Sequence, residues 1–304
     1  MNSKKTQLKT YFKNHLMLYL MMVPGVVALI VFCYVPMYGI IIAFQDFNVF
    51  EGYFGSPWVG LKHFQTLFSD PYFFRLMKNT FLLGMFSFLV SFPAPLILAL
   101  VINECRLNKF KSVVQSISYL PHFIPMVVMV GIMIELFGSY GVVNSVLNFF
   151  GIESISFFSK VQWFRPLYIG SAVWKGAGWG SIIYMGALTA IDTALYEAAE
   201  IDGASRWDRL IHITLPAIKP TVVTLFILDI GGIMKVGFEK VFLMYSPATY
   251  EVADVLSTYV YRQGIVNANF SYSSAVDLFN NVISVCFVLT ANWFAKKLGE
   301  EGIV

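Results

Sequence analysis

Long apolar runs alternate with short polar segments along this 304-residue chain. A helix that crosses a bilayer needs about 20 mostly apolar residues, and six runs in the sequence reach that length. They are expected at 16–44, 80–102, 119–137, 167–188, 221–243 and 275–294. The fifth run is the least regular, because it is interrupted by Asp229, Lys235, Glu239 and Lys240. The pattern predicts an all-α integral membrane protein with six transmembrane helices.

The composition agrees with this prediction. Apolar residues make up 57% of the chain and charged residues 13%, whereas a soluble domain carries about 25% charged residues. We therefore expect a single transmembrane domain over residues 1–304. Residues 1–76 would hold an N-terminal tail, the first span and an outer loop, and residues 77–295 the helical core with a polar loop at 190–220. A net charge of +3 is too small to indicate a nucleic-acid partner.

Lysine and arginine are concentrated on one side of the predicted spans. That side holds Lys4, Lys5, Lys9, Lys13, Arg106, Lys109, Lys111, Arg206, Arg209, Lys219, Lys296 and Lys297, and the other holds Lys62, Arg75, Lys78, Lys160, Arg165 and Arg262. Cytoplasmic segments carry the excess of positive charge, so both termini and the polar loop are expected in the cytoplasm. The first apolar run is too long for a signal-peptide core and holds no A-x-A site, which predicts an uncleaved first span.

The most structured polar stretch is 196–220, between the fourth and fifth apolar runs. Residues 191–201 are expected to form a short helix with a thin face made by Ala194, Ala198 and Ala199. Gly203 is expected to end this helix, because glycine is the usual residue where a helix reverses direction.

A second helix is expected after Gly203. Ser205 and Asp208 have the spacing of a capping box, and the residues that follow offer three apolar anchors, Trp207, Leu210 and Ile211. Pro216 and Pro220 are expected to end this motif, with Pro220 opening the fifth span.

The charge of the loop bears on what it contacts. Acidic residues outnumber basic ones between 192 and 219: Asp192, Glu197, Glu200, Asp202 and Asp208 against Arg206, Arg209 and Lys219. A helix that rests on anionic headgroups is rich in lysine and arginine instead. The balance favours docking into a protein groove, with contact to membrane lipid as the alternative.

Several motifs in the chain match those of one transporter family. EAAxxDGA followed by I-x-LP stands here at 197–204 and 213–216. Further matches are PHFIP at 121–125, Gly141 to Asn144, Trp174, PMYG at 36–39, GSPWVGL at 55–61 and NFSYSSA at 269–275. On these residues the chain resembles the permeases of binding-protein-dependent ABC importers, in their sugar-importer branch and its complex-saccharide (lipoprotein-associated) subgroup.

The resemblance implies a type I (MetI-like) permease that imports an oligosaccharide or complex saccharide across the plasma membrane of a prokaryote. In that family the polar loop is a coupling helix that docks in a cleft of a cytoplasmic ATPase. Glu197 and Gly203 would be the main docking residues, supported by Ala198, Ala199, Asp202, Ala204, Leu215 and Pro216. Other implied partners are a second permease subunit and an extracytoplasmic solute-binding protein, with 46–78 and 247–274 as its candidate contacts.

The chain contains no GxxxxGK[ST] phosphate loop. We therefore expect no enzymatic activity and no cofactor on this chain, with ATP and magnesium bound by the partner ATPase. The four histidines lack the spacing of a metal site.

Polar residues inside the spans are candidates for the substrate pathway, because they are costly in lipid and usually face the bundle interior. With the aromatics beside them they are Glu135, Trp174, Lys175, Trp179, Tyr184, Asp229, Lys235, Asn280 and Asn281. Saccharides are held by aromatic faces together with hydrogen-bonding groups. Trp174, Gly178 and Ser181 share a helical face by spacing, which predicts an aromatic ring beside a gap. Interface anchoring and helix packing are the alternatives for these residues.

Two other functions remain open from the sequence. An ion-coupled secondary transporter of a polar solute would use the intramembrane charges at Glu135, Lys175 and Asp229. An intramembrane enzyme such as a glycosyltransferase would need clustered acids or a metal site at a membrane face. The acidic cluster of this chain lies in the docking loop instead.

Overall fold

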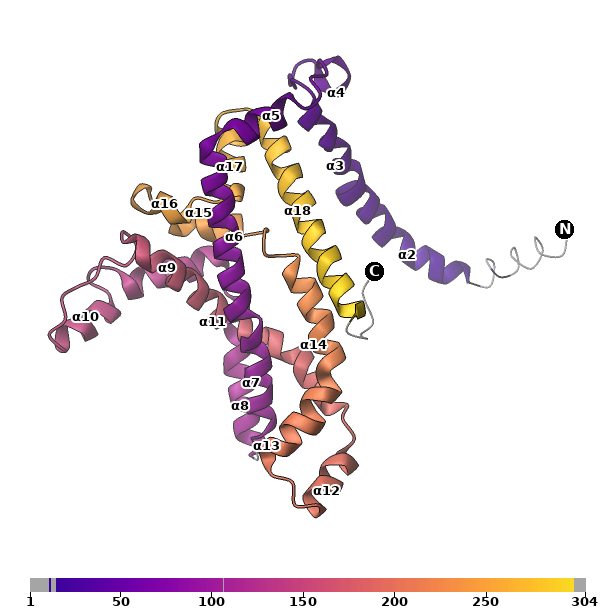
Figure 1. Cartoon of the computed structure of the whole chain (residues 1–304), viewed down its shortest axis with the longest axis vertical. Coiled ribbons are helices and arrows are strands. Elements are labelled where there is room, and N and C mark those ends of the chain that lie inside the picture. The colour runs from indigo at the N-terminus through magenta and orange to yellow at the C-terminus, as the bar shows by residue number, and fades with distance from the viewer. Residues whose placement is uncertain (1–10, 12–14, 106, 298–304) are drawn as a thin grey trace.

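The computed structural model describes residue 11, residues 15–105 and residues 107–297, and this part of the chain is almost entirely helical. The helices form an elongated bundle with α12 at one end and α4 and α5 at the other (Figure 1). An isolated antiparallel bridge joins Gln45 to Trp58.

The first half of the chain builds four groups of helices. A continuous helix runs through α2 (Leu16–Leu29), η1 (Ile30–Tyr34), α3 (Val35–Met37) and η2 (Tyr38–Phe44). The outer segment holds α4 (Gly52–Gly55) and α5 (Lys62–Ser69). There follow α6 (Pro71–Ser91) and α7 (Pro93–Asn103), and then α8 (Asn108–Tyr119), η3 (Leu120–Phe123), α9 (Met126–Phe137) and α10 (Val142–Phe149).

The second half begins with the long helix α11 (Val161–Thr189). The polar loop contains α12 (Thr193–Ile201) and α13 (Arg206–Arg209), and η4 (Leu210–Thr214) leads into α14 (Leu215–Ile230). The chain ends with α15 (Phe238–Met244), η5 (Pro247–Thr249), α16 (Tyr250–Ala253), α17 (Leu256–Tyr261), η6 (Arg262–Val266) and α18 (Phe270–Lys297).

Five of the described helices are long and apolar enough to cross a membrane: Leu16–Phe44, Pro71–Asn103, Met126–Phe149, Arg206–Ile230 and Phe270–Lys297. Helix α11 has 29 residues, a sufficient length. It is less apolar than the five, since it carries Arg165, Lys175 and several glycines. The runs expected at 16–44, 80–102 and 275–294 lie within three of the five helices.

The expectation of one unbroken fifth span at 221–243 is wrong. Helix α14 ends at Ile230, and residues 231–237 form an irregular turn before α15. Exposed carbonyl groups are unfavourable at membrane depth, and two in this turn accept hydrogen bonds from side chains of other helices. Asn280 Nδ2 donates to the Met234 carbonyl at 3.1 Å, and Ser257 Oγ donates to that of Val236 at 3.1 Å.

Two proline effects also differ from expectation. Pro216 and Pro220 do not end the loop motif, because helical backbone is continuous from Arg206 to Ile230. The π-helical turn Leu210–Thr214 precedes Pro216 and widens the helix where the proline ring would meet the preceding turn. The run at 119–137 is broken instead, because Ile124 precedes Pro125 and adopts extended backbone.

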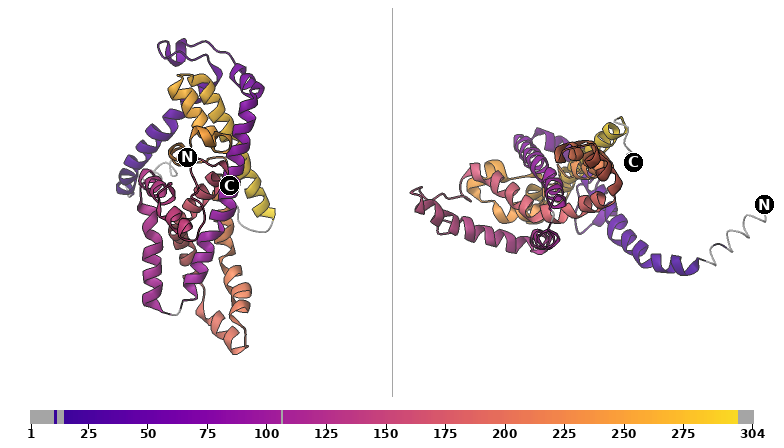
Figure 2. Two further views of the ribbon diagram at one scale, coloured as in Figure 1. Left: turned by 90° about the vertical axis from the view of Figure 1, so that its left-hand side faces the viewer. Right: turned by 90° about the horizontal axis from the view of Figure 1, so that it is seen from below.

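Helix α11 lies at the centre of the packing, against α6, α7, α8 and α14. Its contact with α8 is close: a Cβ on Gly178 would lie 1.8 Å from the carbonyl oxygen of Ser118. A similar approach joins α6 to the 231–237 turn, where a Cβ on Gly84 would lie 1.8 Å from the Ile233 carbonyl oxygen. In contrast, α2 has no buried residue and extends away from the bundle (Figure 2).

Part of the orientation argument lies outside the described residues. Lys4, Lys5, Lys9, Lys13 and Arg106 belong to the side with the greater positive charge, and all five fall in the undescribed stretches. The cytoplasmic placement of the termini therefore stays a prediction.

The α8–α11 contact is tested by adding one methyl group. Gly178→Ala is expected to force the two helices apart and to lower the free energy of unfolding by about 1–3 kcal/mol, as overpacking does. Gly186→Ala is the matched control on the same helix, because no atom lies within 4 Å of its added Cβ. The measurement is the melting temperature of the purified protein in detergent. Equal melting temperatures for both variants would contradict the contact.

Candidate functional site

The polar loop is a compact pair of helices joined by a defined turn. Asp192 caps α12 by accepting a hydrogen bond from the Ala194 amide at 2.9 Å. At the other end Gly203 has φ +77°. The Gly203 amide donates to the Glu200 carbonyl at 3.1 Å, and that of Ala204 to the Ala199 carbonyl at 2.9 Å. This is the pattern of a Schellman motif, whose left-handed residue is usually glycine.

The helix after the turn starts with the expected capping box. The Asp208 amide donates to Ser205 Oγ at 3.2 Å, and the Ser205 amide donates to Asp208 Oδ2 at 2.9 Å. Two contacts join the halves of the loop: a hydrogen bond between the Tyr196 and Thr214 hydroxyls at 2.9 Å, and an ion pair between Arg209 and Glu200 at 3.4 Å. The loop is thereby attached to the helix that continues into α14.

The residues singled out by the EAA motif lie mostly on the surface. Glu197, Ala198, Asp202, Gly203, Leu215 and Pro216 are exposed, and Ala199 and Ala204 are half-buried. Beside them, Ile201 has 87% of its surface exposed and Trp207 has 71%. Helix α12 projects from the end of the bundle (Figure 1). The loop thus presents acidic and apolar side chains together on an exposed surface.

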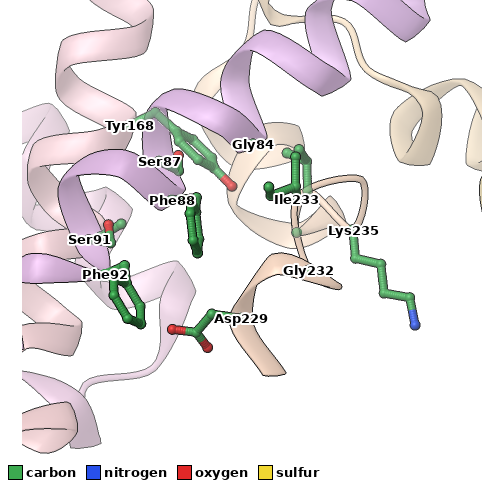
Figure 3. Close-up of a pocket in the computed structure, with 13 residues that line it drawn as sticks. Gly84, Ser87, Phe88, Ser91, Phe92, Tyr168, Asp229, Gly232, Ile233 and Lys235 are labelled. Carbon is green, nitrogen blue, oxygen red and sulfur yellow. The ribbon is translucent and has the colours of Figure 1, made fainter. Parts of the chain in front are cut away.

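A pocket of about 290 Å³ lies at the far end of α14. Its walls come from α6, α11 and the 231–237 turn, and they include Ser87, Phe92, Tyr168, Asp229 and Lys235. Figure 3 shows the Asp229 carboxylate on the side of Phe92, whereas Lys235 points away from it. Both charged residues are exposed.

A second pocket of about 440 Å³ adjoins the first, since Tyr168, Ala172 and Gly237 line both. Lys175 and Lys240 also line the second pocket. Helix α11, the central helix of the bundle, therefore forms a wall shared by two polar hollows.

Trp174 borders a different, apolar pocket of about 330 Å³ between α9 and α11, together with Met129, Met133 and Leu136. The gap predicted at Gly178 and Ser181 is absent there, because the backbone of α8 occupies the space next to Gly178 and Ser181 is fully buried.

The remaining pathway candidates are dispersed. Trp179 stacks on His122 with ring centroids 4.4 Å apart. Tyr184, 2% exposed, packs in an apolar cluster between α7, α11 and α14. Asn280 holds the Met234 carbonyl, Asn281 Nδ2 donates to the Asp277 carboxylate at 3.0 Å, and Glu135 is exposed on α9.

Sequence reasoning missed two polar groups that the fold makes prominent. Asp277 on α18 lines a pocket of about 570 Å³ between α18 and the first helix. The sequence contained a signal for Asp277, because this carboxylate lies within the apolar run at 275–294. The second group surrounds Asp254, whose carboxylate is fully buried and pairs with Arg262 at 2.6 Å. Its other partners are Tyr72, through its hydroxyl, and Thr258.

The pKa of Arg262 is raised above the ordinary guanidinium value. Burial alone would lower this pKa, and the hydrogen bond and charge of Asp254 outweigh burial. Asn79 adds bonds from α6 to the carbonyls of Glu251 at 2.9 Å and Asp254 at 3.1 Å. These groups fasten α6 to residues 250–262. Within the described ranges, no three histidine, cysteine or acidic side chains gather as metal ligands.

Comparisons with known proteins agree with this architecture. The chain is 48% identical to the polygalacturonan/rhamnogalacturonan transport system permease protein YteP of Bacillus subtilis (strain 168), over 94% of this chain and 89% of that protein. Protein LplB of the same organism is 43% identical, over 94% of this chain and 90% of LplB.

A solved structure has a similar fold: a chain of a bacterial alginate ABC transporter in complex with an alginate pentasaccharide-bound periplasmic protein. It has a TM-score of 0.89 and 40% identity, covering 98% of this chain and 100% of that chain. Residues 91–300 match the family described as "Binding-protein-dependent transport system inner membrane component". The chain belongs to this family of inner-membrane transport permeases, and it has their all-helical type I ABC permease fold.

Proposed function

We propose that this chain is a permease subunit of an ATP-driven importer for oligosaccharides or complex saccharides, situated in the plasma membrane as a multi-pass protein. The observation that carries the proposal is the exposed EAA loop, which a hydrogen bond and an ion pair hold to a helix whose far end lines the 290 Å³ pocket. The names of the relatives support a saccharide. They include YteP and, at 28% identity, an arabinooligosaccharide transport permease, AraP of Bacillus subtilis.

The coupling loop, residues 190–220, passes movement of an ATPase to the pathway. The helix Arg206–Ile230 has 25 residues, which at 1.5 Å per residue is about 37 Å, so it connects the loop to the 231–237 turn. Glu197 and Gly203 make the main contacts with the ATPase, supported by Ala198, Ala199, Asp202, Ala204, Leu215 and Pro216. A shift of this loop moves Asp229 and the 231–237 turn, and so changes the shape of both pockets.

Six spans cross the membrane in this proposal, with α11 as the fourth. The central position of α11 explains why it is less apolar than the others, since glycines and polar groups face helices and pockets instead of lipid. Both termini and α12 then lie in the cytoplasm. Residues 1–304 form a single transmembrane domain.

Three partners complete the importer. A dimeric cytoplasmic ATPase binds ATP and magnesium and supplies the energy, so that this chain performs no catalysis itself. A second permease subunit forms the other half of the membrane unit. A solute-binding protein delivers the saccharide to outer segments 46–78 and 247–274, and the alginate transporter structure, which contains a periplasmic protein, supports this partner.

The pathway residues proposed here are those that reach the pockets: Lys175, Asp229 and Lys235, with Trp174 beside the neighbouring apolar hollow. Trp179 contributes through its stack with His122. The other pathway candidates lie on the helices around these pockets: Tyr184, Asn280, Asn281 and Glu135.

A reversed charge or added bulk in the loop is expected to prevent the transported saccharide from stimulating the ATPase. Glu197→Lys should lower saccharide-stimulated ATPase activity by about tenfold or more, the effect of removing one partner from a close charged contact. Gly203→Asp should also lower it, because the added side chain obstructs the docking surface. The measurement uses the complete importer in proteoliposomes, and unchanged assembly is checked by copurification. Glu153→Lys is the control, because Glu153 is exposed and lies outside the loop. Normal stimulation in both loop variants would contradict the proposal.

The backbone requirement of the turn can be separated from side-chain effects at Gly203. Gly203→Val is expected to unfold the turn, because left-handed backbone costs an L-residue about 1–2 kcal/mol and is still less favourable for a β-branched one. Gly203→Asn is the control, since asparagine tolerates this conformation. Hydrogen exchange should become faster at the Ala204 amide in the valine variant alone. Equal exchange in the two variants would show that the turn does not depend on glycine.

A further inference from the structure

Two lysine side chains meet at one pocket, the 440 Å³ hollow between α11 and α15. Lys240 is 5% exposed, and its Nζ donates to the Tyr168 carbonyl at 2.6 Å and lies 4.2 Å from the centre of the Tyr168 ring. Lys175 is half-buried, and its Nζ donates to the Ile124 carbonyl. Each ammonium group is therefore held by a backbone carbonyl.

Neither lysine belongs to the ion pairs that join Lys62 to Asp46, Arg209 to Glu200 and Arg262 to Asp254 in the described part of the chain. Glu239 lines the same pocket, as does His122, and one carboxylate leaves an excess of positive charge beside two lysines. The ammonium group of the half-buried Lys175 is stabilised by a nearby anion, so the pocket is suited to an anionic ligand.

The hydrogen-bonding capacity agrees with this reading. An ammonium group has three donors, and the carbonyl contact of each lysine uses one of them. Lys175, which is only half-buried, can donate its others to a ligand in the pocket. Glu239 offers acceptors for hydroxyl groups.

An aromatic surface borders the same pocket. The His122 ring lies parallel to that of Trp179, at an interplanar angle of 7°, and Phe238 lines the pocket. Apolar C–H faces of a sugar ring pack on such surfaces while its polar groups bond elsewhere. The pocket thus combines cationic donors with flat apolar walls.

We propose that this pocket binds a negatively charged saccharide, with Lys175 and Lys240 as donors to its carboxylate or sulfate groups. The inference rests on the proposed transport function and names the substrate class of the same pathway. Neutral saccharides leave the two ammonium groups unpaired and are carried less well.

The test uses the complete importer, with its binding protein, in proteoliposomes. Transport is measured for two matched pairs: oligogalacturonates against their methyl esters, and sulfated galactan oligomers against their desulfated forms. The wild type should carry at least one charged form in preference to its neutral partner. Because the binding protein is the same throughout, a change caused by a permease variant reports on this chain.

Lys175→Gln should lower transport of the charged form by about tenfold, the effect expected for one charged hydrogen bond, and Lys175→Arg should restore most of it. Lys240→Gln should act in the same direction. Lys109→Gln is the control, since Lys109 is exposed on α8 away from the pocket. Melting temperatures show whether each variant is folded, and Lys175, the less buried lysine, decides the test if Lys240→Gln does not fold.

Three results would overturn the inference: a preference of the wild type for neutral saccharides, unchanged transport of the charged form in Lys175→Gln, or failure of Lys175→Arg to restore it. These results leave the importer function intact. If no saccharide stimulates the wild-type importer, the proposed function fails, and this site with it.

Discussion

The continuous helix from Arg206 to Ile230 is the physical link on which the rest of this structure depends. A loop transmits movement only if the backbone behind it is stiff, and two prolines lie in this helix. The π-helical turn before Pro216 absorbs the missing hydrogen bond without a break. The Tyr196–Thr214 hydrogen bond then joins α12 to the same stiff element.

The opposite end of that helix, at Ile230, leads into the irregular turn 231–237, and the surrounding helices hold this turn in place. Irregular backbone is tolerated at membrane depth where protein covers it or where it lines a cavity. Asn280 and Ser257 bond to carbonyls of the 231–237 turn, and the absence of a side chain at Gly84 lets α6 approach it. Both polar pockets lie against this turn. The 231–237 turn therefore sets both the end of the helix Arg206–Ile230 and the position of the two pockets.

At the end of the bundle that holds α5, a buried polar network joins α6 to residues 250–262. Asp254 is completely buried yet bonded to Arg262, Tyr72 and Thr258, so its charge is compensated. Asn79 adds bonds from α6 to carbonyls of the same segment. A fully satisfied polar network of this kind favours a single arrangement of its helices. The network therefore fixes α6 against residues 250–262.

The sequence by itself determined what depends on neighbouring residues. The apolar runs at 16–44, 80–102 and 275–294 lie in long helices, and Gly203 and the Ser205–Asp208 capping box form the turn that their local chemistry predicts. The tertiary structure decided what depends on distant residues. An apolar run does not reveal that its helix ends at Ile230. Ser257 and Asn280, distant in sequence, donate hydrogen bonds to carbonyls of the turn that follows, and Gly84 leaves room for that turn. In the same way, α8 closes the gap expected at Gly178, and only folding brings Lys175 and Lys240 to one pocket.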